Sequence, residues 1–485
     1  MKYVIMCGGK YDNFKEPKQF TIVNGERIVD RTCRLLREHN IEDVIIVSND
    51  MRFDSCSFPR VENKQNNFSQ TKSWTNIKGW WLDAFYHTNE PTCYLFGDVF
   101  YSDEAMKKII EAETDDCLLF GSDPSSSEGY LIKSWYEPLA VKVVNYKRFY
   151  KGIEEVKKLY TQGKVKRHPI AWELYRHLFN LDINGRQLEE HFICINDCST
   201  DIDNVNDNEN DAKRIEYFLN KEKGICNQLS KVFGIISWLP NKEPARGLRI
   251  ERLDRAFKQI YDLFGDVNFL VIAQNWKDYQ VPSYLSNVQI VKCEPLGILG
   301  ARKKLREEFL KTNYDYLIMC DDDVIIEQTG PLCAELYMDE LNMNPHGFMF
   351  LQYDAAQLNL CAISRYIYEK ERMVNIDPQK GEGYEDVVFA WLLHYKYPKN
   401  EFYAHGLKCI QFLNRNEKAP STWASTNAFD HNKMAKLSWY HIRKFEKGDF
   451  TIDKKQAEIY VAKQKFYERA LEMGWINKED IGKTC

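Results

Sequence analysis

Strand-length apolar runs alternate with stretches of helical period from the first residue of this chain, and this order constrains the fold more than any single motif. An apolar run at 2–7 is followed by a helical stretch at 27–40 and a second apolar run at 43–48. Alternation of this kind is typical of a mostly parallel β-sheet with helices on its faces. The sequence therefore predicts an α/β protein.

The series occurs twice. In its first half we also expect strands at 91–96, 116–121 and 192–195, with helices near 103–113 and 211–220. The order then restarts with a strand at 232–239, a helix at 248–263, strands at 269–273 and 288–292, a helix at 297–310 and a strand at 316–319. The restart predicts two Rossmann-like αβα domains, at 1–225 and 232–430, each with a mostly parallel central sheet. Residues 431–485 are predicted to form a helical C-terminal extension.

Charge and hydropathy limit the partners of the chain. Lys and Arg number 66 against 71 Asp and Glu, and no basic tract is suited to nucleic-acid phosphates. The longest apolar runs have about strand length, which is too short for a membrane-spanning helix of roughly 20 residues. None of the 14 cysteines forms a C-x-x-C pair, as expected of thiols in a reducing compartment. We therefore expect a cytoplasmic protein, free or peripheral at the inner membrane face, and a homo-oligomer is compatible with this sequence.

A glycine pair closes the first predicted strand. Gly8 and Gly9 leave the backbone open to a phosphate, and Lys10, Lys15 and Lys18 follow in the same loop. Backbone N–H groups and lysines supply the positive potential that phosphoryl groups require. The sequence favours a nucleotide-binding loop, although an ordinary tight turn also explains two glycines.

Carboxylates follow two later strands of the first domain. Asp98 comes directly after the run at 91–96, and Asp201 and Asp203 follow the run at 192–195. Ligands of open α/β sheets bind at the carboxyl ends of strands, where two carboxylates can hold Mg²⁺ against phosphate oxygens. Taken singly, each aspartate could equally be a helix cap.

The first 220 residues resemble the sugar-phosphate and polyol-phosphate nucleotidyltransferases, including the MobA-like NTP transferases. The resemblance rests on Met6-Cys7-Gly8-Gly9, Pro17-Lys18-Gln19-Phe20, Gly97-Asp98 and Asp201-Ile202-Asp203. It implies that the loop binds an NTP, that Lys18 is catalytic through its contact with the phosphates, and that Asp98 and Asp203 hold Mg²⁺ or Mn²⁺. The arginine that usually follows the glycines is missing, and Lys10 or Lys15 could supply its charge only as a point charge.

Two further residues are candidates for binding the substrate of this domain. Trp81 lies in an aromatic run beside charged residues, as in many sugar-phosphate pockets, although an aromatic core residue would fit as well. Lys142 lies in an apolar strand and could reach the sugar phosphate, or else extend along the surface.

The run at 316–319 ends in three consecutive carboxylates, Asp321, Asp322 and Asp323. Adjacent anions repel one another, so a divalent metal explains the triplet, with a solvated acidic turn as the alternative. Together with the helix start at 297–302 and the run Gly383-Tyr384-Glu385-Asp386, this triplet resembles the inverting GT-A glycosyltransferases.

That second resemblance implies that Asp321 and Asp323 hold Mn²⁺ or Mg²⁺ on the diphosphate of a nucleotide-sugar donor. Asp322 and Arg302 would contact the nucleotide. Asp386 would be the general base for the acceptor, with Glu385 as the substitute.

The two resemblances together predict a bifunctional transferase. It would make a nucleotide-activated sugar or polyol, with release of pyrophosphate, and transfer a sugar to a glycan or lipid-linked acceptor in bacterial surface-polysaccharide synthesis. Two alternatives remain: only the second domain is active and the first is a nucleotide-binding relic, or both form a carbohydrate- or nucleotide-sensing scaffold.

Overall fold

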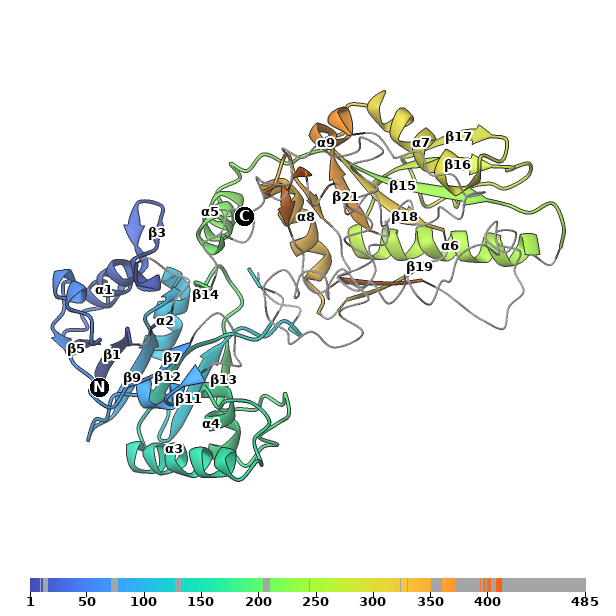
Figure 1. The fold of residues 1–485 in the computed structure, drawn as a ribbon. Helices are drawn as coiled ribbons and strands as arrows, with labels where there is room; N and C mark the ends of the chain where they lie inside the picture. The colour runs from blue at the N-terminus through green and yellow to red at the C-terminus, as the bar shows by residue number, and fades with distance from the viewer. Residues whose placement is uncertain are drawn as a thin grey trace, which may run out of the picture. The chain divides into compact units, whose positions relative to one another are not determined.

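The fold is that of a computed structural model (Figure 1). It describes residues 1–8, 10–11, 16–70, 77–126, 129, 132–133, 135–203, 210–243, 245–322, 324–328, 330–349, 360–371, 393, 396–397, 399–402 and 407–411. The chain divides into two compact units, Met1–Cys226 with Gly330–Leu332, and Asn227–Thr329 with Cys333–Cys485. The predicted helical extension at 431–485 lies outside the described residues.

The first unit is built on a seven-stranded sheet in the order β13-β11-β12-β9-β1-β5-β6. These strands are β1 (Lys2–Met6), β5 (Val44–Val47), β6 (Arg60–Val61), β9 (Thr92–Phe96), β11 (Cys117–Gly121), β12 (Pro138–Val143) and β13 (Phe192–Cys194). All neighbouring pairs are parallel except the two that β12 makes with β9 and β11. Consequently β12 begins at the edge of the sheet where β1 and β9 end.

Among the described residues, five α-helices and three short ladders complete the first unit. The helices are α1 (Ile28–Glu38), α2 (Asp103–Glu111), α3 (Tyr146–Thr161), α4 (Ala171–Leu178) and α5 (Asp211–Glu222). The ladders join β2 (Lys10–Tyr11), β7 (Ser69–Gln70) and β8 (Ile77–Lys78), then β3 (Ile22–Val23) and β4 (Glu26–Arg27), then β10 (Val99–Phe100) and β14 (Thr200–Asp201). Three of the helices begin at side-chain caps, which are Ser102 for α2, Asn145 for α3 and Asn210 for α5.

The second unit has its own seven-stranded sheet in the order β17-β16-β15-β18-β21-β20-β22. The strands are β15 (Lys231–Trp238), β16 (Asn268–Gln274), β17 (Val288–Cys293), β18 (Tyr316–Asp321), β20 (Phe348–Met349), β21 (Cys361–Ser364) and β22 (Glu401–Phe402). Only β21 runs antiparallel to its neighbours. A separate antiparallel ladder joins β19 (Val324–Gln328) and β23 (Leu407–Gln411).

Successive residues of β15 enter different cores, because side chains alternate between the faces of a strand. Phe233 and Ile235 join the core that includes Phe257 of α6 (Ala245–Phe264) and Tyr337 of α8 (Cys333–Met343). Val232 and Ile236 join the core formed with α7 (Gly297–Leu310) and α9 (Arg365–Lys370). The second unit is thus a three-layered αβα unit.

Both sheets are mostly parallel and are packed with helices, so the predicted α/β class with two Rossmann-like units is confirmed. Among the described residues, no helix combines the length and the apolar character needed to cross a membrane.

Candidate functional site

The carboxyl edge of the first sheet brings two predicted aspartates together. Asp98 lies two residues after the end of β9, and the next residue, Val99 of β10, lies opposite Asp201 of β14 in an antiparallel pair. The main-chain N–H of Ile202 donates to the carbonyl of Asp98 at 2.8 Å. This ladder places Asp203 beside Asp98 although the two are far apart in the sequence.

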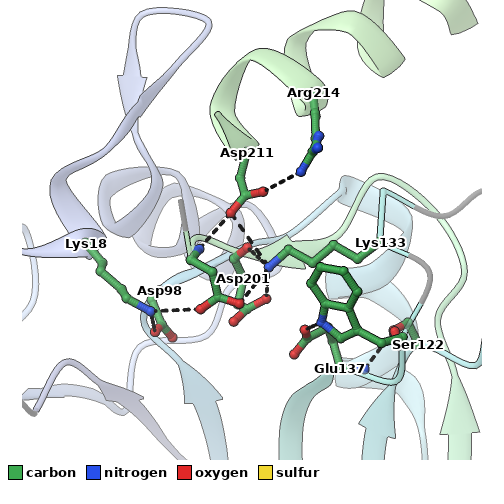
Figure 2. A network of polar contacts seen from close by, with 10 residues as sticks. Lys18, Asp98, Ser122, Lys133, Glu137, Asp201, Asp211 and Arg214 are labelled. Carbon is green, nitrogen blue, oxygen red and sulfur yellow. Dashed lines mark hydrogen bonds and ion pairs between the residues drawn. The ribbon is translucent and has the colours of Figure 1, made fainter. Parts of the chain in front are cut away.

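Lys18 joins these two carboxylates. It begins a 3₁₀ turn, Lys18–Phe20, that follows Pro17. Its Nζ lies 3.0 Å from Asp203 Oδ1 and 3.6 Å from Asp98 Oδ2 (Figure 2). The lysine is buried, whereas the side chains of Asp98 and Asp203 are 19% and 40% exposed. The structure therefore brings Lys18, Asp98 and Asp203 into one cluster, with the carboxylates on its open side.

A second lysine, Lys133, enters the same cluster. Its Nζ lies 2.6 Å from Asp201 Oδ1, 3.0 Å from Asp203 Oδ2 and 3.7 Å from Asp211 Oδ2. The two oxygens of Asp203 are thus bonded to two different lysines, Oδ1 to Lys18 and Oδ2 to Lys133. Two ammonium groups beside solvent-accessible carboxylates suit a phosphate-bearing ligand.

The electrostatics of the cluster shift the pKa values of Asp201 and Asp203 in opposite directions. Burial by itself raises the pKa of Asp203, but the charges of Lys133 and Lys18 outweigh it and lower that pKa below its usual range. Burial, together with the charge of Asp203, raises the pKa of Asp201 to about 7. Asp203 is therefore ionised at neutral pH, while Asp201 titrates near neutrality.

The donor set of the cluster suits a hard divalent cation. Glu137, Asp201 and Asp203 each offer an oxygen within 4.8 Å of the others. Burial and the charge of Asp201 raise the pKa of Glu137 well above its usual range, and Glu137 Oε1 accepts a hydrogen bond from Trp135 Nε1. Carboxylate oxygens are the ligands that Mg²⁺ and Mn²⁺ prefer, and Asp203 belongs both to this group and to the pair that it forms with Asp98 around the Lys18 ammonium.

Glycines shape the same edge of the sheet. A Cβ at Gly8 would collide with the side-chain amide of Asn66, and one at Gly97 would lie 2.5 Å from Cys7 Sγ and 2.7 Å from Met6 O. Lys10 lies in β2, but its side chain, Gly9 and Lys15 fall outside the described part of the chain. The predicted role of this loop in holding phosphates stays a prediction.

Lys142 lies away from the cluster, and its predicted contact with the sugar phosphate stays a prediction. Its Nζ donates to the carbonyls of Ile110 at 3.0 Å and Ala112 at 2.6 Å, at the end of α2. The reason is the direction of β12, in which Lys142 pairs with Cys93 near the start of β9. Lys142 therefore lies toward the edge of the sheet opposite Asp98.

Trp81 packs as a core residue at the margin of the site. Its ring contacts Phe85 and Phe96 edge-on, with centroids 5.7 and 5.5 Å apart, and its main-chain N–H donates to His168 Nε2 at 3.2 Å. Phe96 is the last residue of β9. Trp81 thus supports the strand that carries Asp98, and its predicted contact with substrate stays a prediction.

In the second unit, the end of β18 shows two ion pairs. Asp321 Oδ1 lies 3.5 Å from an Arg302 side-chain nitrogen, which brings together a predicted metal ligand and a predicted nucleotide-binding residue. Asp322 is buried, with Oδ1 3.2 Å from Arg249, and its predicted contact with a nucleotide stays a prediction. Asp323, Glu385 and Asp386 lie outside the described residues.

Lys133, Glu137, Asp211 and Arg249 were not among the predicted site residues. The sequence carried one signal for Asp211, because it lies in the same acidic stretch as Asp203. Lys133 and Glu137 precede the antiparallel strand β12, so only the strand direction could have placed them at this edge.

No protein-family model matches this chain, and no curated protein does. A solved structure described as a glucose-1-phosphate thymidylyltransferase from Bacillus anthracis, in complex with sucrose, matches at 14% identity with a TM-score of 0.27, over 40% of this chain and 86% of the other. The glycosyltransferase GlyE of Streptococcus pneumoniae matches at 9% identity with a TM-score of 0.26, over 65% of this chain and 86% of the other. Similarities this weak carry no argument about activity.

Proposed function

We propose that the first unit joins an NTP to a sugar phosphate or polyol phosphate and releases pyrophosphate. The observation that carries the proposal is the single Lys18 ammonium bonded to both Asp98 and Asp203 at the carboxyl edge of the sheet. This arrangement combines a buried positive charge with ionisable oxygens that are open to solvent. Nucleotidyl transfer requires both, because charge develops on phosphate oxygens while the nucleophile attacks.

In the proposed reaction, an oxygen of the substrate phosphate forms a bond to the α-phosphorus of the NTP, and the bond between the α-phosphorus and the bridging oxygen breaks. Pyrophosphate leaves with that electron pair. Lys18 would offset charge on the NTP phosphates, and Lys133, which is bonded to Asp203, would supply positive charge beside the attacking phosphate. A divalent cation held by Asp98 and Asp203 would neutralise phosphate charge.

The test is pyrophosphate release by the full-length chain from a panel of NTPs and sugar or polyol phosphates with Mg²⁺. We expect turnover for at least one pair, and a loss of about 100-fold or more in Asp98→Asn and Asp203→Asn. Asp43→Asn is the control, because Asp43 is an exposed carboxylate paired with Lys2 at the opposite edge of the sheet. Turnover that persists in both site variants contradicts the assignment.

For the second unit we propose metal-dependent glycosyl transfer from a nucleotide sugar. The supporting observation is the pair Arg302 and Asp321 at the end of β18. Asp323 would complete the metal site, and Asp386 would act as general base with Glu385 as its substitute. Asp386→Asn should lower transfer by about 10²–10⁴-fold with donor binding nearly intact. A parent transfer rate in Asp386→Asn would assign Asp386 to capping a helix instead.

The two activities together would make this a bifunctional transferase of bacterial surface-polysaccharide synthesis, whose first unit prepares a donor. If the first unit only binds nucleotide, the chain will form no pyrophosphate and no nucleotide-activated sugar or polyol, while sugar transfer by the second unit persists. A scaffold without catalysis would bind the nucleotide sugar and release no nucleotide from it.

A further inference from the structure

Asp211 lies within the acidic cluster but not on its open side. It is the first residue of α5, and none of its surface is exposed. Its Oδ2 accepts a hydrogen bond from the main-chain N–H of Asp203 at 2.7 Å and lies 3.7 Å from Lys133 Nζ. Its Oδ1 lies 3.4 Å from Arg214 of the same helix. Figure 2 shows Asp211 between Arg214 and the lysine–aspartate cluster.

We propose that Asp211 is a positioning residue, which holds the main chain of Asp203 and the ammonium of Lys133 where they can act on phosphates and on a divalent cation. The inference rests on the proposed nucleotidyl transfer, because it assigns Asp203 to the cation and Lys133 to the substrate phosphate. Asp211 itself would touch neither ligand.

The reason for a carboxylate at this place lies in the geometry of Asp203. The oxygens of Asp203 are divided between Lys18 and Lys133, so a small shift of its main chain would break one of these two bonds. A charged acceptor on the Asp203 N–H makes a stronger hydrogen bond than a neutral one and fixes that main chain. Because an unpaired buried carboxylate is costly, the pairing with Lys133 and Arg214 is what allows Asp211 to be buried.

Helix α5 also supports the other half of the cluster. Glu216 Oε1 accepts a hydrogen bond at 2.9 Å from the main-chain N–H of Asn24, in the turn between β3 and β4. This hairpin follows the 3₁₀ turn that begins with Lys18. The helix therefore contacts both the segment after Lys18 and the residue Asp203. Positioning by α5 accounts for both contacts.

The competing explanation is that an aspartate in the first turn merely stabilises its helix through the helix dipole. Asp103 provides a matched control for this effect. It is the first residue of α2, directly after the capping residue Ser102, as Asp211 follows Asn210. Asp103 is 73% exposed and pairs with Arg31 at the surface, outside the Lys18–Asp203 cluster.

The experiment measures Mn²⁺ binding to the full-length chain by electron paramagnetic resonance, without nucleotide. All proteins carry Asp321→Asn, which weakens the site proposed in the second unit. We expect Asp211→Ala to raise the Mn²⁺ Kd by about 10–100-fold, the usual effect of losing a partner of a metal ligand. Asp211→Asn should have a smaller effect, since its amide oxygen still accepts from the Asp203 N–H. Asp103→Ala and Asp103→Asn should leave the Mn²⁺ Kd within about twofold of the parent, and their thermal destabilisation should be smaller than that of Asp211→Ala because Asp103 is exposed.

An unchanged Mn²⁺ Kd in both Asp211 variants overturns the inference, as does a parent chain that binds no Mn²⁺. If Asp211→Ala does not fold, Asp211→Asn decides, because it keeps the volume of the side chain. Failure of the proposed function is recognised separately, as an absence of pyrophosphate release from the parent. A parent that releases pyrophosphate, beside an Asp211→Asn variant with unchanged kcat and Mn²⁺ Kd, overturns the positioning role alone.

Discussion

Lys18 and Lys142 are both buried lysines of the first unit, but their ammonium groups have opposite surroundings. Lys18 is bonded to two carboxylates, whereas Lys142 donates to two main-chain carbonyls at the end of α2. Burial lowers the pKa of Lys142, and the nearby charges of Cys93 and Glu113 offset this effect only in part. The first arrangement suits phosphate chemistry, and the second closes a helix end.

We expect Lys142→Met to destabilise the chain by about 1–2 kcal/mol, because two buried carbonyls lose their donor. Pyrophosphate release should stay within about twofold of the parent. Lys18→Met should lower release by about 100-fold or more. Thermal unfolding and a pyrophosphate assay on both variants test these expectations. A loss of turnover in Lys142→Met without destabilisation would show that Lys142 takes part in substrate binding.

Gly97 has no side chain, and this lets the chain after β9 pack closely against the end of β1 beside Asp98. A methyl group there would meet Cys7 Sγ and the carbonyl of Met6, so Gly97→Ala should destabilise by about 1–3 kcal/mol and displace Asp98. Gly247→Ala is the control, since its Cβ would meet only the flexible carboxylate of Glu243. Thermal unfolding measures the difference, and equal stability of the two variants would contradict the packing argument.

At the scale of secondary structure elements, the direction of each strand decided which residues could be grouped together from the sequence. Lys18, Asp98 and Asp203 could be placed together from sequence, because parallel strands end at one edge of a sheet. No motif marks β12 as antiparallel, so the sequence did not show that Lys142 lies away from the edge that carries Asp98. For the same reason Lys133 and Glu137, which precede β12, were missed.

Local sequence chemistry decided how well individual helices and strands were predicted. The predicted helix at 297–310 matches α7, and the predicted strand at 91–96 differs from β9 by one residue. Helix α3 was not predicted, although its buried residues Phe149, Ile153 and Val156 have helical spacing. Its aromatic residues and Gly152 have weak helix propensity, so tertiary packing contributes much of its stability.

Lys231, the first residue of β15, gives the second unit a dependence on pH. Burial lowers its pKa to about 8 against the nearby charges of Asp339 and Asp315, and its Nζ donates to Asn342 Oδ1 at 2.5 Å. Between pH 8 and 10.5 the unfolded chain therefore binds more protons at this residue than the folded chain does. The contribution of Lys231 to the free energy of unfolding rises with pH across that window.

We expect the stability of the parent relative to Lys231→Met to increase by about 1–2 kcal/mol between pH 8 and pH 10, a value reduced for the partial exposure of Lys231. Urea unfolding of both full-length proteins at several pH values measures the difference. A constant difference across this range would show that the pKa of Lys231 is not lowered.

At the scale of the whole molecule, the chain holds two αβα units, and each carries a candidate aspartate at the end of a strand of its own sheet, Asp98 just after β9 and Asp321 at the end of β18. The restart of the sequence pattern after residue 231 predicted two units, since strands alternate with helices in each of them. The acceptor-side residues Glu385 and Asp386 rest on sequence resemblance alone. Two separate sites are the central claim of this account.

The most direct test assays pyrophosphate release and nucleotide release from nucleotide sugars on three full-length proteins: the parent, Asp98→Asn and Asp321→Asn. We predict that Asp98→Asn loses pyrophosphate release by about 100-fold or more and retains nucleotide release, while Asp321→Asn shows the reverse. Loss of both activities in either variant, with unchanged thermal unfolding, would contradict two independent sites.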